Sequence, residues 1–260
     1  MHNPWIIFIL ITALILLTAC GSNVTEPASA PTALIPATEA PATVAASSSA
    51  DEAEASSSTD SPADTVSVQS EEQLVLSSFS QPVTASGVPL VLYGHVLDAS
   101  GAPLSGYAVE IWQVDADGIY DHPGDRNTGG RDMGFQFYGT SVTDENGLFA
   151  FRTIVPAIYE PRPRHIHFKV KKDGQELLTS QFYFSGEVDA EQLGSGGEMI
   201  LLDLSNAQDG GGNAVKLAYK DIVLNTGSGG DMTVTPTQVE GPYYPVVDVS
   251  AFDSDLASVQ

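Results

Sequence analysis

The sequence predicts an all-β domain, an antiparallel β-sandwich or barrel, from residue 78 to residue 225. Three observations favour this fold class. Short apolar runs rich in β-branched and aromatic residues recur in this region, Gly, Asp and Asn turn signals separate them, and no long run has the 3.6-residue period of a helix. A stretch of about 145 residues can bury a sizeable core without disulfides. The single cysteine of the chain in any case excludes an intramolecular disulfide framework.

The expected strands are, in chain order, residues 90–97, 108–114, 141–143, 148–151, 165–170, 178–184 and 216–224. Turn sequences bound several of them: the first two end at residues 98–101 and 115–118, and residues 144–147 join the third to the fourth. Gly, Asp and Asn favour such turns because Gly accepts positive φ angles and the Asp or Asn side chain bonds to nearby backbone.

The N-terminal segment, residues 1–19, is predicted to be a signal peptide. Residues 5–17 are apolar except for Thr12, which is shorter than the roughly 18 residues that a stable membrane-spanning helix needs. The following residues, up to Cys20, resemble a bacterial lipobox, which implies that Cys20 is lipidated and binds a lipid bilayer. No Lys or Arg precedes the apolar run, which departs from the usual signal, and an uncleaved anchor helix is the alternative. Both interpretations predict an extracytoplasmic, membrane-anchored protein, a bacterial lipoprotein in the first case.

Residues 20–77 are predicted to be a disordered, lipid-anchored linker. Of the 50 residues from 21 to 70, 34 are Ala, Ser, Thr or Pro, and seven are acidic. A segment with so little large apolar surface cannot offset the entropy of ordering its backbone. The whole chain has 33 acidic and 10 basic residues, a formal charge of -23, which argues against nucleic acid as a partner.

A metal site is predicted around His165 and His167. In a strand, residues two apart point to the same face, so these imidazoles can converge on one ion while Ile166 faces a core. Two histidines on a solvated strand face are the alternative. Two tyrosines, Tyr120 and Tyr159, precede the pair, and a set of two imidazoles and two phenolates suits Fe(III) better than Zn or Mg.

Several motifs occur in order along the domain, at residues 94–98, 109–122, 143–147, 151–156, 162–168 and 181–184. Together they resemble the intradiol ring-cleavage dioxygenases, most closely the protocatechuate 3,4-dioxygenase-like catalytic domain. The resemblance implies a β-sandwich that holds a mononuclear non-haem Fe(III). It also implies an enzyme that cleaves a catechol-type substrate between its two hydroxylated carbons and incorporates both atoms of O2.

The resemblance also assigns roles to individual residues. The metal ligands it implies are Tyr120, Tyr159, His165 and His167. Tyr159 is in addition expected to leave the metal and accept a proton from the catechol. Arg162 is expected to stabilise charge on the substrate ring, and Gln181 to lie near the substrate. An ion pair of Arg162 with an acidic residue and ordinary packing of the tyrosines are the alternatives to these roles.

Two features depart from the family pattern. The loop between Tyr159 and His165 is shorter than usual and lacks a Trp, so ring-substituent preference cannot be transferred. The family's Thr-Pro-x-Gln-x-Glu-Gly-Pro-Tyr-Tyr segment usually precedes the first strand, but here it occupies residues 235–244, inside a Gly-rich connector and tail at 226–260.

Our hypothesis for this displaced segment is a circular permutation, in which the tail returns to the site. Exchange of the tail between subunits of an oligomer and a disordered, vestigial tail are the alternatives. Deletion of residues 231–260 is expected to impair activity while leaving a folded core.

Other interpretations remain open. Six basic residues and one acidic residue between residues 152 and 172 predict a locally positive metal loop or ordinary solvated strand charge. His122, two residues after Tyr120, is interpreted as a group that orients this tyrosine. The rival function is a non-catalytic stalked β-sandwich binding module, and copper or zinc in the same cage is a further alternative.

Overall fold

The computed structural model describes residues 69–227 and 229–259. The predicted signal peptide, the lipidation site Cys20 and most of the predicted linker lie outside these residues. Within them, no helix has the length and apolar character that a bilayer-spanning segment requires.

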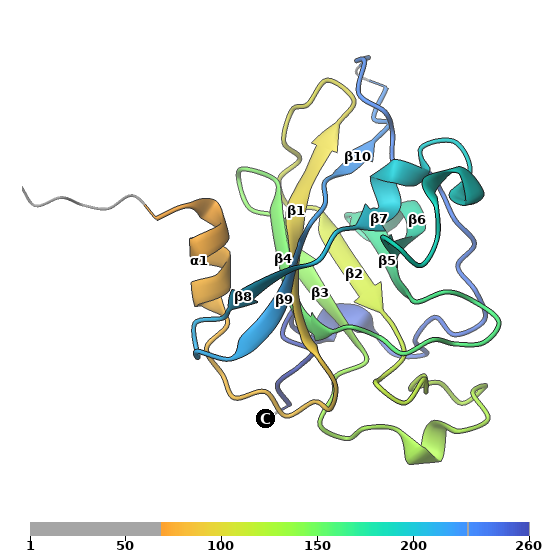
Figure 1. Ribbon diagram of the computed structural model, residues 1–260. Coiled ribbons are helices and arrows are strands. Elements are labelled where there is room, and N and C mark those ends of the chain that lie inside the picture. Colours follow the sequence, from red (N-terminus) through yellow and green to blue (C-terminus); the bar gives the residue numbers. More distant parts are fainter. Residues whose placement is uncertain (1–68, 228, 260) are drawn as a thin grey trace, which may run out of the picture. The chain divides into compact units, whose positions relative to one another are not determined.

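Ten strands form two five-stranded sheets (Figure 1). The strands are β1 (Pro89–Asp98), β2 (Ala108–Trp112), β3 (Tyr138–Val142), β4 (Leu148–Ile154), β5 (His165–Lys172), β6 (Gln175–Phe184), β7 (Leu201–Leu202), β8 (Ser205–Gln208), β9 (Ala214–Tyr219) and β10 (Ile222–Leu224). The helices are α1 (Glu71–Ser78) and four 3-10 turns: η1 (Thr128–Gly130), η2 (Ala190–Leu193), η3 (Gly197–Ile200) and η4 (Val249–Ala251). One sheet has the order β10-β1-β9-β8 with β4 also paired to β1, and the other has the order β3-β2-β5-β6-β7.

The predicted all-β sandwich is confirmed, and every predicted strand range overlaps an observed strand. The two sheets are not purely antiparallel, however. β1 pairs in parallel with β9 and β10, and β6 pairs in parallel with β7. These partners are far apart in sequence or joined by a long connection, so no hairpin forces them to run in opposite directions.

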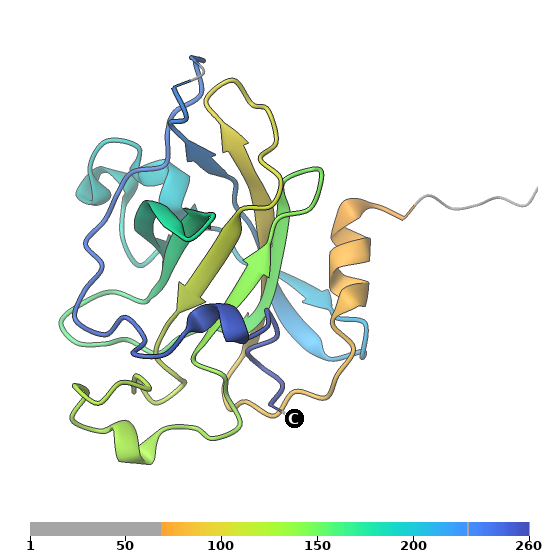
Figure 2. The same cartoon turned by 180° about the vertical axis from the view of Figure 1, so that it is seen from behind.

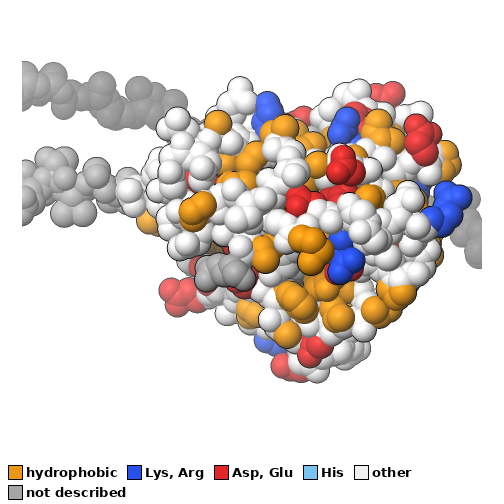
Figure 3. Space-filling model, turned by 90° about the horizontal axis from the view of Figure 1, so that it is seen from below, with side chains coloured by type: hydrophobic (Ala, Val, Ile, Leu, Met, Phe, Trp, Pro, Cys, Tyr) orange, Lys and Arg blue, Asp and Glu red, His pale blue; other side chains and the backbone are white. Residues whose placement is uncertain are grey.

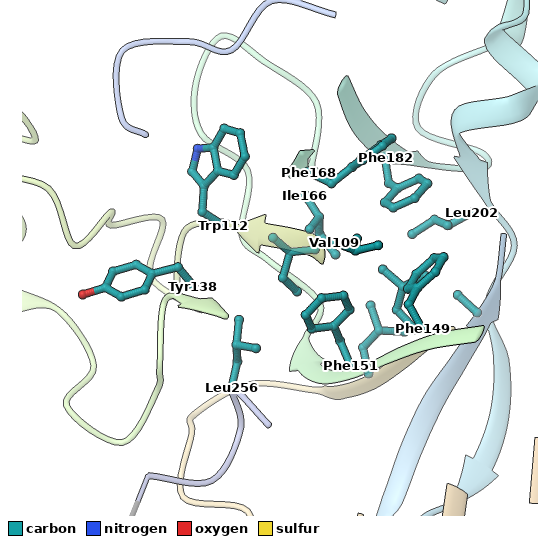
Figure 4. Close-up of a cluster of buried hydrophobic side chains, with 14 of the residues drawn as sticks. Val109, Trp112, Tyr138, Phe149, Phe151, Ile166, Phe168, Phe182, Leu202 and Leu256 are labelled. Carbon is teal, nitrogen blue, oxygen red and sulfur yellow. The ribbon is translucent and has the colours of Figure 1, made fainter. Parts of the chain in front are cut away.

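The core lies between the sheets and follows the two-residue period of the strands (Figure 4). Ile166 and Phe168 of β5 are fully buried in it, as the sequence predicts. Opposite them, Phe149 and Phe151 of β4 come from the other sheet and are equally buried. Burial of each such side chain contributes roughly 1.5–3 kcal/mol, and the pairing leaves the other face of β5 free for polar side chains.

The interruption between β9 and β10 lies opposite Gly94 of β1. The amide of Lys220, in that interruption, donates to the Tyr93 carbonyl at 2.9 Å. A Cβ atom built on Gly94 would lie only 2.0 Å from the Lys220 carbonyl oxygen. Only glycine fits this close approach of two backbones.

Replacement of Gly94 by alanine is therefore expected to destabilise the domain by about 1–3 kcal/mol, because the clash involves backbone that must shift. Gly129→Ala is the matched control, since a Cβ atom there meets nothing within 4 Å. Urea unfolding of the two variants measures the difference. Equal midpoints for both would contradict the tight approach at Gly94.

Helix α1 corrects the predicted linker boundary. Residues 71–77 were expected to belong to the disordered linker, but they form α1, whose Val75 and Leu76 are buried. Together with Phe79 they pack on Val91 of β1, on the outer face of the first sheet. The Ser70 side chain caps the helix by accepting a hydrogen bond from the Gln73 amide at 3.3 Å. The domain thus begins near residue 70, because a short apolar cluster there has a sheet face to cover.

The residues after β10 wrap around the domain within one chain (Figure 2). They first run beside β10 and β6, where the Thr235 amide bonds to the Val223 carbonyl and the Gln238 amide to the Thr179 carbonyl. They end between β3 and β4, where Leu256 is fully buried. Within one chain the tail thus returns to the body of the domain, as the circular-permutation hypothesis predicts.

The tail also takes part in a buried ion-pair cluster. The Arg152 guanidinium bonds to Asp255 of the tail at 2.7 and 2.9 Å and to Asp209, in the β8–β9 turn, at 2.6 Å. The side chains of Arg152 and Asp209 are completely buried. The structure argues against the expectation that removal of residues 231–260 leaves a folded core, because that deletion would expose residues packed under the tail and leave Arg152 with only one acidic partner.

Candidate metal centre

The outer face of β5 carries the predicted imidazole ligands. β5 is the central strand of its sheet, between β2 and β6, and its core-facing residues alternate with His165, His167, Lys169 and Lys171. Both histidines are 2% exposed. They are therefore buried at the edge of the core, and the alternative of two histidines on a solvated face is wrong.

The structure brings Tyr120 to both histidines. Its hydroxyl oxygen lies 3.2 Å from Nε2 of His165 and 3.1 Å from Nε2 of His167. The tyrosine follows the 115–118 turn, and its amide donates to the Asp125 carboxylate at 3.1 Å. These loop contacts hold the phenol oxygen of Tyr120 next to two imidazole nitrogens.

Both imidazoles are neutral at pH 7. Nδ1 of His165 lies 2.8 Å from the Pro163 carbonyl, so Nδ1 carries the proton and the Nε2 lone pair faces Tyr120. Burial lowers the pKa of His165 to about 4, although the bond to Pro163 acts in the opposite direction. Burial also lowers the pKa of His167 well below its usual range, and the neighbouring His165 adds to this effect.

Tyr159 lies beside this cluster but has a different partner. Its ring is 5.3 Å from that of Tyr120, and its hydroxyl donates to the Tyr243 hydroxyl at 3.0 Å. Burial, followed by the bond to Tyr243, raises the pKa of Tyr159 to about 12. Burial likewise raises the pKa of Tyr120 above its usual value. Both phenols are neutral by themselves at pH 7, and a bound cation would act in the opposite direction.

A cavity of about 190 Å³ opens onto these groups. Its lining residues are Tyr120, Tyr159, Glu160, Pro161, Arg162, His165, His167, Pro242 and Tyr243. All four predicted metal ligands and the predicted charge-stabilising arginine therefore face one space. Two of the lining residues, Pro242 and Tyr243, come from the displaced segment at 235–244, which the sequence did not link to particular contacts.

Arg162 reaches two residues of β6. Its Nη2 donates to the Gln181 side-chain oxygen and, at 3.0 Å, to the Tyr183 hydroxyl. The strand register explains this, because Gln181 pairs with His167 and Tyr183 with His165. Tyr183 was not singled out from the sequence, although its position two residues after Gln181 places it on the same face.

The expectation of a locally positive loop is wrong for most of its basic residues, because they have acidic partners. Arg152 and Arg164 pair with acidic side chains, and so do Lys169 and Lys171. Figure 3 shows one face of the molecule, on which both signs of charge are interspersed with hydrophobic side chains. Arg162 differs: within the described ranges, no carboxylate lies within ion-pair distance of it, so its predicted alternative, an acidic partner, is not found.

His122 does not take the role expected for it. Its Nδ1 accepts a hydrogen bond from the Gly124 amide at 2.9 Å, and its ring packs 5.4 Å from that of Tyr243. It therefore supports the tail segment rather than orienting Tyr120.

The donor set fits a hard metal ion. Nitrogen and oxygen ligands that lie about 2.0–2.2 Å from one ion are about 3 Å from each other, which matches the spacing of Tyr120 Oη and the two Nε2 atoms. In the described part of the chain, no three His, Cys, Asp or Glu side chains form a metal cluster. A metal held here by the converging side chains would be bound by two imidazole nitrogens and tyrosine oxygen.

Comparisons with known proteins show the family to which this chain is similar. Residues 60–226 match the family model described as dioxygenase. Catechol 1,2-dioxygenase of Acinetobacter baylyi is 34% identical over 39% of this chain and 38% of its own length. The protocatechuate 3,4-dioxygenase beta chain of Burkholderia cepacia is 39% identical over 39% of this chain and 46% of its own length.

Among solved structures, the dioxygenase domain of a carbohydrate-binding fusion protein from Streptomyces sp. SirexAA-E is 33% identical, with a TM-score of 0.43. That match covers 56% of this chain and 90% of the other. The aligned part of this chain spans less than half the length of the curated relatives named above. Since the family model covers most of the folded domain, the chain belongs to the intradiol ring-cleavage dioxygenase family.

Proposed function

We propose that this protein is a non-haem Fe(III) dioxygenase that cleaves a catechol-type ring between its two hydroxylated carbons with O2. The observation that carries the proposal is the convergence of Tyr120, His165 and His167 on one wall of a small cavity that also contains Arg162. The names of the curated relatives, which include catechol 1,2-dioxygenase, support the substrate class.

Each side chain has a task in this proposal. Tyr120, Tyr159, His165 and His167 hold the iron. Bound Fe(III) would draw electron density from a catecholate and make its ring reactive toward O2. Tyr159, on the cavity wall, would lose its proton on binding the iron; as a phenolate it would take a proton from a catechol hydroxyl and become the neutral phenol that bonds to Tyr243.

Arg162 supplies the positive charge for the substrate. Its guanidinium lines the cavity and is oriented by Gln181 and Tyr183, which are neutral. A preorganised cation without a carboxylate partner stabilises negative charge that develops on a bound ring.

Replacement of Arg162 by methionine is expected to lower kcat by about 10²–10³-fold, the usual cost of removing one preorganised electrostatic donor. Arg162→Lys retains the charge but loses the planar fork, and so should lose less activity than the methionine variant. Steady-state oxygen uptake measures both. Full activity in Arg162→Met would exclude this role, provided that its iron content equals that of the unchanged protein.

One experiment tests the proposed function. The purified protein is analysed for metal and for the broad visible absorption of tyrosinate bound to Fe(III), and a catechol is then added without oxygen. We expect iron, a coloured protein and a spectral change, followed by oxygen uptake and a ring-opened product from members of a catechol panel. A colourless protein without iron would favour the binding module, and bound copper or zinc would favour another chemistry.

We also propose that the protein is exported and lipidated at Cys20. The support is the sequence alone, in which the only cysteine of the chain lies three residues after the end of an apolar run. Labelling with a fatty-acid analogue in a bacterial host should modify the unchanged protein but not Cys20→Ala. Equal labelling of the two proteins would contradict the proposal.

A further inference from the structure

The tail crosses the same face of β5 that carries the histidines. Along this face, His165 and His167 are followed by Lys169 and Lys171. Both lysines contact the tail: Nζ of Lys169 lies 2.5 Å from the Glu240 carboxylate, and Nζ of Lys171 lies 3.0 Å from the Tyr244 hydroxyl. One face of β5 therefore carries both the predicted imidazole ligands and the lysines that bind the tail segment covering them.

Lys169 is an unusual residue in this position because its side chain is almost entirely buried, with 6% exposure. Its ammonium group lies between two carboxylates, that of Glu176 at 2.6 Å and that of Glu240 at 2.5 Å. It also lies 4.1 Å from the centre of the Tyr244 ring. Of its two carboxylate partners, Glu176 belongs to β6 and only Glu240 belongs to the tail.

The residues that follow Glu240 lie on the metal centre. Gly241 adopts a positive φ of 80°, and a Cβ atom built there would lie 3.4 Å from Cε1 of His167. The next two residues, Pro242 and Tyr243, line the cavity. The position of Glu240 therefore sets how the tail covers the cavity.

A second contact lies just beyond this cover. The Tyr244 hydroxyl donates to Glu110 at 2.8 Å and accepts from Lys171, which itself pairs with Glu110 at 2.7 Å. The Tyr244 ring packs edge-on against Trp112 at 5.0 Å. Residues 241–243, which cover the cavity, are thus held in place on both sides: by the contact of Glu240 before them and by the contacts of Tyr244 after them.

We propose that Lys169 is a positioning residue of the metal centre, which through Glu240 holds residues 241–243 in place as one wall of the substrate cavity. The kinetic part of this proposal rests on the proposed dioxygenase function, whereas the structural part does not. If residues 241–243 became mobile, substrate binding would weaken more than the catalytic step would slow, because the metal ligands and Arg162 would stay in place.

The test compares Glu240→Ala with Glu176→Ala. Both substitutions remove one carboxylate from Lys169 and leave the other, and both side chains are more than 40% exposed, so neither change opens the core. Loss of a charged hydrogen bond typically changes such an equilibrium about tenfold, so Glu240→Ala should raise the open population of the tail by about this factor. Glu176→Ala should leave the tail closed.

Two measurements read the result. Hydrogen–deuterium exchange of a peptide covering residues 234–247 should become about tenfold faster in Glu240→Ala and stay unchanged in Glu176→Ala. With a catechol substrate, Glu240→Ala should raise KM about tenfold with little change in kcat. The visible absorption before substrate is added should stay the same, and Lys169→Arg should keep the tail closed.

The outcomes separate this proposal from the proposed function. Unchanged exchange in Glu240→Ala, or equal acceleration in both alanine variants, would overturn the positioning role, whatever the activity. A fall in kcat at constant KM would also contradict it, because the wall would then act in the chemical step. A protein without dioxygenase activity would overturn the proposed function, while the exchange experiment would still decide the role of Lys169.

Discussion

Replacement of Tyr120 by phenylalanine is expected to reduce dioxygenase activity by more than about 100-fold, since loss of residues that merely support metal ligands already costs about 10–100-fold. The substitution removes one oxygen atom, the one that lies within 3.2 Å of both Nε2 atoms. Without it, the described ligands that converge are two imidazoles, which favour softer ions than Fe(III). Metal analysis and visible absorption should show loss of iron, or loss of the tyrosinate band.

Tyr138→Phe is the matched control for this prediction. Tyr138 is also a buried tyrosine, but its hydroxyl contacts Asp121 at 3.4 Å and lies outside the metal cavity. It should keep both iron and activity. If Tyr120→Phe retained iron, colour and turnover, the metal would have to be held by other residues and the proposed site would be wrong.

The imidazole pair could be predicted from the sequence because its geometry is local. The two-residue period of a strand alone places His165 and His167 on one face, with Ile166 in the core. The tyrosines are different, since Tyr120 reaches the histidines from one loop and Tyr159 reaches the same cavity from another. The expectation that they bind the metal followed from the family resemblance and not from any pattern in the loops.

The contacts of Tyr243 could not be predicted in the same way. The tyrosine lies 84 residues after its partner Tyr159. Local sequence propensities cannot predict such a long-range contact, because the contact depends on how the tail crosses β5. The alternation that reveals the histidines also places Lys169 and Lys171 on their face, but the sequence does not show which carboxylates they bind.

The same distinction applies to the fold: elements with a strong local pattern could be predicted, and elements that depend on tertiary packing could not. Strands with strong alternation, such as β1 and β5, were predicted to within one or two residues of their observed ends. Helix α1 was missed because eight residues with two buried side chains carry little periodicity. Its stability depends on packing against Val91 and other residues of the first sheet, which a sequence pattern does not contain.

Replacement of Arg152 by methionine is expected to destabilise the domain by about 3–5 kcal/mol, the usual cost of breaking a buried ion pair by removing one partner. The substitution leaves Asp209 fully buried with no cation, and it also frees Asp255. For a domain of this size, the midpoint temperature of thermal unfolding should fall by about 6–20 °C. Calorimetry or circular dichroism during heating measures the shift.

Arg131→Met provides the matched control, because it removes an arginine whose ion pair with Asp121 is about one-third exposed on both sides. Such surface pairs contribute at most about 1 kcal/mol, so its midpoint should stay close to that of the unchanged protein. A similar small shift for Arg152→Met would mean that the tail is not bound through this cluster. A large shift would indicate that the cluster of Arg152, Asp209 and Asp255 stabilises the sandwich, in which the tail residue Asp255 is bound to the sheet opposite the one that carries His165 and His167.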